Sequence, residues 1–116
     1  MGWAHAAYDP ALLASSHLPD CTYSRVHVEG VPYARVSLSE AAAGYAARRD
    51  RGETDRNSRW RVLLVAPSDR IAAAKLDVVY RGVRHVDHLL LLRTASGWRI
   101  AAAAWGDPSR GKAPAR

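Results

Sequence analysis

The sequence contains one cysteine, Cys21, and no continuous apolar run long enough to cross a membrane. A single cysteine excludes an intrachain disulfide and a thiolate metal cluster, and a membrane-spanning helix needs roughly 20 apolar residues. The N-terminal stretch Met1–Pro10 also lacks the basic start and apolar core of a signal peptide. We therefore expect a cytoplasmic protein in which Cys21 is a small buried apolar side chain.

Motifs that hold cofactors or activate nucleophiles are also missing. The chain has no glycine-rich phosphate loop, no Gly-x-Ser-x-Gly element and no pattern typical of a cysteine–histidine pair. A metal site at His85, Asp87 and His88 is not favoured, because His88 is expected on the opposite face of a strand and at least three ligands are needed. We expect neither a cofactor nor a metal.

The net charge of +6 raises the question of nucleic-acid binding. The excess is concentrated in Arg48–Arg61, where six arginines stand against three acidic residues, and in the C-terminal tail. Such a distribution is typical of solvated surface, and no aromatic platform or recognition helix accompanies it. Specific nucleic-acid binding is not expected, although Arg48–Arg61 stays a candidate contact for acidic partners.

The most apolar stretch, His85–Trp105, predicts two long strands joined by a tight turn at Ala95-Ser96. Because side chains alternate along a strand, each face carries a fixed set. One set is His85, Asp87, Leu89, Leu91, Trp98, Ile100, Ala102 and Ala104, and the other is Arg84, Val86, His88, Leu90, Leu92, Arg99, Ala101, Ala103 and Trp105. Both faces are apolar in the middle, so we expect helices to cover one and a second copy, in a twofold homodimer, to cover the other.

The remaining segments predict helices and strands in an α+β order. In chain order they are the end of a helix at Met1–Tyr8, a short helix from Asp9-Pro10 to about His17, strands Cys21–Val28 and Tyr33–Val36, a helix from the Ser37–Glu40 capping box to Gly52, a mobile loop Arg51–Ser58, and strands Trp60–Ala66 and Ile71–Tyr80. We expect a single domain over residues 1–105, with a mostly antiparallel sheet and N-terminal helices packed on one face. A basic, disordered tail follows at residues 106–116.

Five segments carry a family resemblance: Gly2-Trp3, Asp9-Pro10, His17 to Pro19-Asp20, Leu38-Ser39, and VDHLLLLRTASGWRI ending in Trp105. Over residues 2–105 the chain resembles the nuclear transport factor 2-like superfamily, in the branch of SnoaL-like polyketide cyclases and "putative lumazine-binding" proteins. The resemblance implies a cone-shaped domain with helices on a curved sheet, a pocket inside, and frequent dimerisation through the sheet. The chain departs from the family at two points. Members usually have a longer first helix before the Gly-Trp pair, and they commonly have the histidine directly before the proline, whereas Leu18 separates His17 from Pro19 here.

Asp87 and His85 are the candidate catalytic pair. They lie on one face of an apolar strand, two residues apart and thus about 7 Å along it. A carboxyl group in apolar surroundings can both give and take a proton near neutral pH, and a neighbouring imidazole can pair with it or relay the proton. In the alternative interpretation both residues lie at the sheet rim, hydrogen-bonded and half exposed.

Tyr23, Arg25 and His27 share one face of the first strand. If that face lines the pocket, Tyr23 is a further catalytic candidate as a donor to an oxyanion, and Arg25 and His27 bind substrate. If it is the opposite face, all three are rim or dimer contacts. The other candidates for substrate binding are Tyr45, Trp98, Leu89 and Leu91, each of which also suits a packing role.

These residues predict a small-molecule pocket protein with cofactor-independent acid–base chemistry on an apolar metabolite, of the isomerase, cyclase or dehydratase type. Ketosteroid isomerases of this fold place their base carboxylate near the position of Arg25, so the resemblance disfavours that one mechanism here. The alternative function is a non-catalytic ligand-binding or dimerisation module, and whether the protein is an enzyme stays open.

Overall fold

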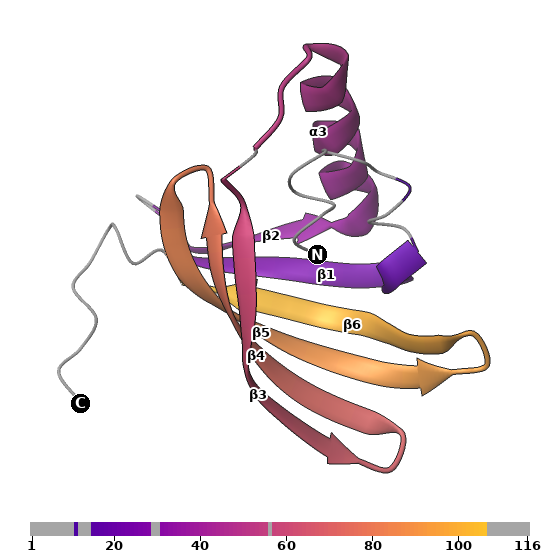
Figure 1. Cartoon of the computed structure of the whole chain (residues 1–116). Coiled ribbons are helices and arrows are strands. Elements are labelled where there is room, and N and C mark those ends of the chain that lie inside the picture. Colours follow the sequence, from indigo (N-terminus) through magenta and orange to yellow (C-terminus); the bar gives the residue numbers. More distant parts are fainter. Residues whose placement is uncertain (1–10, 12–14, 29–30, 56, 107–116) are drawn as a thin grey trace, which may run out of the picture.

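The computed structural model describes residue 11 and residues 15–28, 31–55 and 57–106, and within these ranges one complete α-helix and six strands are found (Figure 1). The elements are β1 (His17–Val28), β2 (Val31–Ser37), α3 (Leu38–Asp50), β3 (Arg59–Ser68), β4 (Ile71–Tyr80), β5 (Val83–Thr94) and β6 (Gly97–Trp105). The α+β class and the curved, mostly antiparallel sheet are as predicted. The helices expected before residue 11 and the tail at 107–116 lie outside the described residues.

The six strands form one sheet in the order β2-β1-β6-β5-β4-β3. Neighbours are antiparallel except β1 and β6, which run parallel because β6 returns from the β3–β6 meander to the free side of β1. Helix α3 stands over the β1–β2 end of the curved sheet (Figure 1). No helix in the described part of the chain is long and apolar enough to span a membrane.

Helix α3 begins at the predicted capping box. The N–H of Glu40 donates to Oγ of Ser37 over 3.2 Å, and the N–H of Ser37 donates to Oε1 of Glu40 over 3.4 Å. Gly52 follows the helix with a φ of +74°, a conformation that favours glycine. Leu38 and Tyr45 of this helix are buried against the sheet.

Strand β1 begins at His17, four residues before the predicted start at Cys21. The prediction placed His17 in a helix ended by Pro19, whereas helical conformation is found at Ala11, Ser15 and Ser16 and stops there. Pro19 is tolerated in the strand because the pairing with β6 is irregular between His17 and Thr22, and pairing with β2 starts only at Thr22. The early start brings His17 into the core.

The β5–β6 hairpin has the predicted register only near its turn. Arg93 pairs with Trp98 and Leu91 with Ile100, but a bulge then shifts the register by one residue. As a result Leu89 pairs with Ala103 and Asp87 with Trp105. The predicted faces of Ala102–Trp105 are therefore wrong: Ala103 and Trp105 lie on the face of Asp87, and Ala102 and Ala104 lie on the other.

The two faces of the sheet differ sharply in burial. The inner face, which carries Asp87 and packs against α3, holds the core, whose members are Cys21, Tyr23, Leu38, Tyr45, Leu76, Val78, Leu89, Ile100 and Ala103. The outer face carries Leu64, Ile71 and Leu90, each more than 40% exposed. Within the described residues nothing covers this apolar outer surface.

Candidate functional site

Asp87 is buried at the centre of the inner face and lies against His85. Nε2 of His85 is 3.1 Å from Oδ1 of Asp87, and the side chains are 12% and 3% exposed. The contact does not have hydrogen-bond geometry, so Oδ1 accepts no hydrogen bond from any described residue. On β4 the residues opposite Asp87 and His85 are the buried Leu76 and Val78. Asp87 thus has the apolar surroundings that the sequence indicated.

A second polar pair, Tyr23 and His17, is buried on strand β1. The hydroxyl of Tyr23 lies 2.8 Å from Nε2 of His17, and Nδ1 of His17 lies 2.8 Å from Oγ of Ser16. Tyr23 is on the inner face, because it pairs with Ala103 of β6, so the outer-face interpretation is wrong. His17 was not among the predicted site residues. His17 and Tyr23 are an even number of residues apart. Strand alternation would therefore have placed them on the same face if the predicted strand had been extended back through Pro19.

Trp105 joins the two pairs. Its ring centroid is 6.0 Å from that of Tyr23 and 6.2 Å from that of His85, and its strand β6 lies between β1 and β5. The sequence placed Trp105 on the outer face, and only the bulge turns it inward. The inner face therefore carries a continuous cluster of His17, Tyr23, Trp105, His85 and Asp87, which we call the inner polar cluster.

Burial changes the acid–base behaviour of two groups beside this cluster. Burial raises the pKa of the Tyr23 phenol well above its ordinary value of 10.0, and the negative charges of ionised Cys21 and Asp87 raise it further. Tyr23 is therefore a neutral hydroxyl that can donate a hydrogen bond at any physiological pH. Burial, with a smaller effect of Asp20, raises the pKa of the Cys21 thiol to about 11. Cys21 is thus an inert thiol, as expected for a small buried side chain.

The predicted substrate-binding residues are distributed less favourably. Leu89 is buried and Leu91 half-buried on the inner face, and Tyr45 reaches the same core from α3. Arg25 is exposed towards the end of β1, and Trp98 is 40% exposed beside the turn of the β5–β6 hairpin. The side chain of His27 lies outside the described residues. The structure therefore gathers Tyr23, His85, Asp87, Leu89 and their neighbours, but not Trp98.

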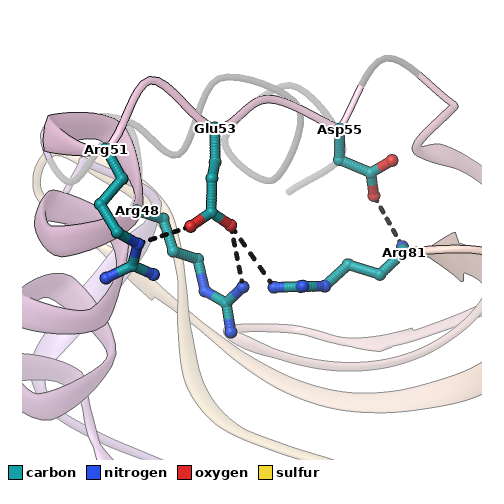
Figure 2. Close-up of polar contacts among 5 residues, drawn as sticks. All are labelled: Arg48, Arg51, Glu53, Asp55 and Arg81. Carbon is teal, nitrogen blue, oxygen red and sulfur yellow. Dashed lines mark hydrogen bonds and ion pairs between the residues drawn. The ribbon is translucent and has the colours of Figure 1, made fainter.

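The arginine-rich loop after α3 is tied down by contacts with acidic residues (Figure 2). Glu53 contacts Arg51 Nε at 2.7 Å, Arg48 Nη1 at 3.5 Å and Arg81 Nη1 at 3.8 Å. Oδ2 of the buried Asp55 accepts from the Arg81 N–H over 2.7 Å. The hydrogen bond from Arg51, with the nearby guanidinium charges, lowers the pKa of Glu53. Glu53 thus holds three arginines in place, but its single negative charge balances only one of them, so an acidic partner at this loop stays a prediction.

Comparison with known families agrees with this geometry. The profile of the family described as "Putative lumazine-binding" matches residues 3–106, nearly the whole chain. The chain belongs to this family. No curated protein matches it at a significant level.

The solved structures similar to this lumazine-binding-family domain have the nuclear transport factor 2-like fold. An NTF2-like protein of unknown function from Silicibacter pomeroyi has a TM-score of 0.77 at 20% identity, covering 90% of this chain and 83% of that one. One from Shewanella baltica has a TM-score of 0.73 at 14% identity, covering 90% and 82%. A "putative ketosteroid isomerase" from Parabacteroides distasonis has a TM-score of 0.60 at 16% identity, covering 90% and 80%. The predicted superfamily is confirmed, and its fold is that of a ligand-binding pocket domain.

Proposed function

We propose that this domain binds a small, mostly apolar ligand against the inner polar cluster and catalyses cofactor-independent proton transfer through Asp87 and His85. The observation that carries the proposal is the buried oxygen Oδ1 of Asp87, which lacks a hydrogen-bond donor among the described residues. A buried polar atom without a partner costs about 1–3 kcal/mol of stability. A purely structural carboxylate would be expected to have its donors supplied by the fold, whereas one that awaits a ligand would not.

Each member of the inner polar cluster has a role in this proposal. Asp87 takes or gives the proton, and His85, 3.1 Å away, orients the carboxylate and relays the proton. Tyr23, kept neutral by its raised pKa, accepts from the Nε2–H of His17 and donates its own O–H to an oxygen on which negative charge develops. Trp105 supplies an aromatic wall that suits a flat ligand.

The family description suggests the ligand class. A lumazine is a flat bicyclic ring system with N–H donors and carbonyl acceptors, which could meet Asp87 and Tyr23 respectively. One neighbour is named a "putative ketosteroid isomerase", but Arg25 stands near the expected place of that base, so the proposed proton transfer runs through Asp87 instead. Cyclase and dehydratase reactions of the SnoaL-like kind use the same elementary steps and are the other candidates.

The test uses 6,7-dimethyllumazine, whose methyl protons lie next to ring imine groups and are acidic. We expect the protein to bind it, and to accelerate exchange of these protons with deuterium in D2O, followed by NMR. Asp87→Asn should abolish exchange and leave the melting temperature within a few degrees of wild type. Asp77→Asn is the matched control: it is a carboxylate on the neighbouring strand but on the outer face, and exchange should be unchanged.

The alternative function, a non-catalytic ligand-binding module, predicts a different result. Binding would then survive Asp87→Asn and be independent of pH, and no exchange would be seen in either protein. A large loss of stability in Asp87→Asn, without any ligand effect, would instead assign Asp87 a structural role and contradict the catalytic function.

We also propose that two copies associate through the outer face. Ile71, Leu90 and Leu64 are 50%, 42% and 57% exposed there, and covering such a surface is strongly favourable. Leu90→Arg should convert a dimer to a monomer in sedimentation equilibrium, whereas Trp98→Arg, at an exposed position on the inner face, should not. A monomeric wild-type protein at 100 µM would contradict this proposal. The cytoplasmic location and the domain boundary at residue 105 stay predictions.

A further inference from the structure

An open depression of about 410 Å³ lies at the β3–β5 end of the sheet, and none of the predicted catalytic or substrate-binding residues lines it, although two of its arginines end the Arg48–Arg61 stretch. Its lining is Arg59, Trp60, Arg61, Asp77, Val79 and Arg84. We propose that this depression binds the phosphate group of a small phosphorylated molecule, whose apolar or aromatic part packs against Val79. A volume of this size is within the range of roughly 300–1,000 Å³ that ligand sites occupy.

The strand register sets up the basic frame of the depression. Val79 of β4 pairs with Arg59 of β3 on one side and with Arg84 of β5 on the other, so the three residues form a row across the sheet. Arg61 pairs with Asp77, two residues along β4 and on the same face. Three guanidinium groups from two strands therefore surround one valine and one carboxylate. Trp60, between Arg59 and Arg61 on the edge strand, also lines the depression, but its pairing with Val78 directs its side chain to the inner face.

The charges of these groups do not balance. Asp77 accepts from Arg84 Nε over 2.7 Å and from Arg61 Nη2 over 3.4 Å, while Arg59 contacts no carboxylate among the described residues. Each guanidinium carries five N–H donors, so Arg61 and Arg84 each have most of their donors left after the hydrogen bond to Asp77. Their side chains are 71% and 67% exposed, whereas that of Asp77 is 16% exposed. The carboxylate thus orients two arginines and leaves an excess of two positive charges facing the opening.

This excess matches a phosphate monoester, which is close to a dianion at neutral pH and pairs well with planar guanidinium forks. The other arginine cluster, at Glu53, is a poorer candidate. There Arg48, Arg51 and Arg81 all contact the single carboxylate (Figure 2), so they serve to fasten the loop. The depression shares the outer face with Leu64, which pairs with Lys75 two residues from Asp77, but it lies about 20 Å along β4 from Ile71.

The test is a titration of the full chain with phenyl phosphate, followed by isothermal calorimetry and amide NMR shifts. We expect saturable binding with shifts centred on β3–β5, and weaker binding of inorganic phosphate. Arg84→Gln and Arg61→Gln should each weaken binding of phenyl phosphate about tenfold, as loss of a charge-assisted hydrogen bond predicts. Arg93→Gln is the charge-matched control at the other end of β5 and should leave binding unchanged.

Further variants separate this site from general electrostatics and from the inner polar cluster. Val79→Ala should reduce the preference for phenyl phosphate over inorganic phosphate, and Asp87→Asn should change neither affinity. The proposal is overturned if phenyl phosphate shows no saturable binding up to about 10 mM, a weak limit for a small ligand. It is also overturned if Arg93→Gln lowers the affinity as much as Arg84→Gln does. An unchanged ratio of the two affinities in Val79→Ala would likewise contradict it.

Discussion

Asp87 and Trp105 face each other across strands β5 and β6. The pairing exists only because of a bulge. Leu91 pairs with Ile100, but the next residue of β5, Leu90, pairs with Ala102, so β6 has one additional residue at this point. Without it, Trp105 would lie on the outer face and the inner polar cluster would lose its aromatic member. A local irregularity thus decides which side chains surround the candidate catalytic carboxylate.

Trp105→Ala tests this placement. Trp105 is half-buried and packs against the core and the rings of Tyr23 and His85, so we expect the free energy of unfolding to fall by about 2–3 kcal/mol. The oligomeric state, measured by sedimentation, should not change, because the residue is not on the outer face. Trp98→Ala, an exposed tryptophan of the same strand, should cost much less. A shift to monomers in Trp105→Ala would indicate that Trp105 lies on the outer face and contradict its placement on the inner face.

Because Tyr23 and His17 are hydrogen-bonded, we expect that removing the Tyr23 hydroxyl alone lowers the free energy of unfolding. Tyr23→Phe leaves Nε2 of the buried His17 without its partner, so urea unfolding should show a loss of about 1–3 kcal/mol. Tyr33→Phe, which removes the same atom from an exposed side chain of β2, should be neutral. The double variant Tyr23→Phe with His17→Leu should recover part of the loss. Equal effects of Tyr23→Phe and Tyr33→Phe would rule out a contribution of the buried bond.

Alkaline pH should destabilise the fold through Tyr23 and Cys21. Folding raises both pKa values, from the ordinary 10.0 for Tyr23 and from 9.0 to about 11 for Cys21. A raised folded-state pKa gives stability that is present below the unfolded value and is lost as pH rises through the folded value. Urea midpoints should therefore fall from pH 9 upward. The slope should become shallower in Cys21→Ala above pH 9 and in Tyr23→Phe above pH 10. A wild-type slope in both variants would assign the loss to other groups.

Glu53 should fasten the loop after α3 in a pH-dependent way. Because its pKa is lowered from 4.5, chiefly by the hydrogen bond from Arg51, its contribution is present above pH 4.5 and is lost as pH falls through the folded value. Hydrogen-exchange protection of the Gly52 and Glu53 amides, which donate to Arg49 and Arg48 carbonyls, should drop on acidification. Glu53→Gln should show the same drop at pH 7. Asp50→Asn, at the exposed end of α3, is the control and should retain full protection.

Much of the fold followed from local patterns. The capping box at Ser37 and Glu40 started α3 where expected, strand β4 has the predicted limits of Ile71 and Tyr80, and the β5–β6 turn has the predicted pairing as far as Leu91 and Ile100. Each of these depends on residues within a few positions of one another. Two local signals misled: Pro19 indicated the end of a helix, and regular alternation misplaced Ala102–Trp105.

The sequence by itself determined that Asp87 and His85 share a face of an apolar strand, because strand alternation is a property of the backbone. It also determined that the core strands are apolar on both sides. Only the tertiary structure decided that Tyr23, His17 and Trp105 lie on the same face as Asp87. That outcome depends on the parallel pairing of β1 with β6, about 80 residues later in the chain, and on a bulge. Neither leaves a local signature, because both arise from how distant strands fit together within one curved sheet.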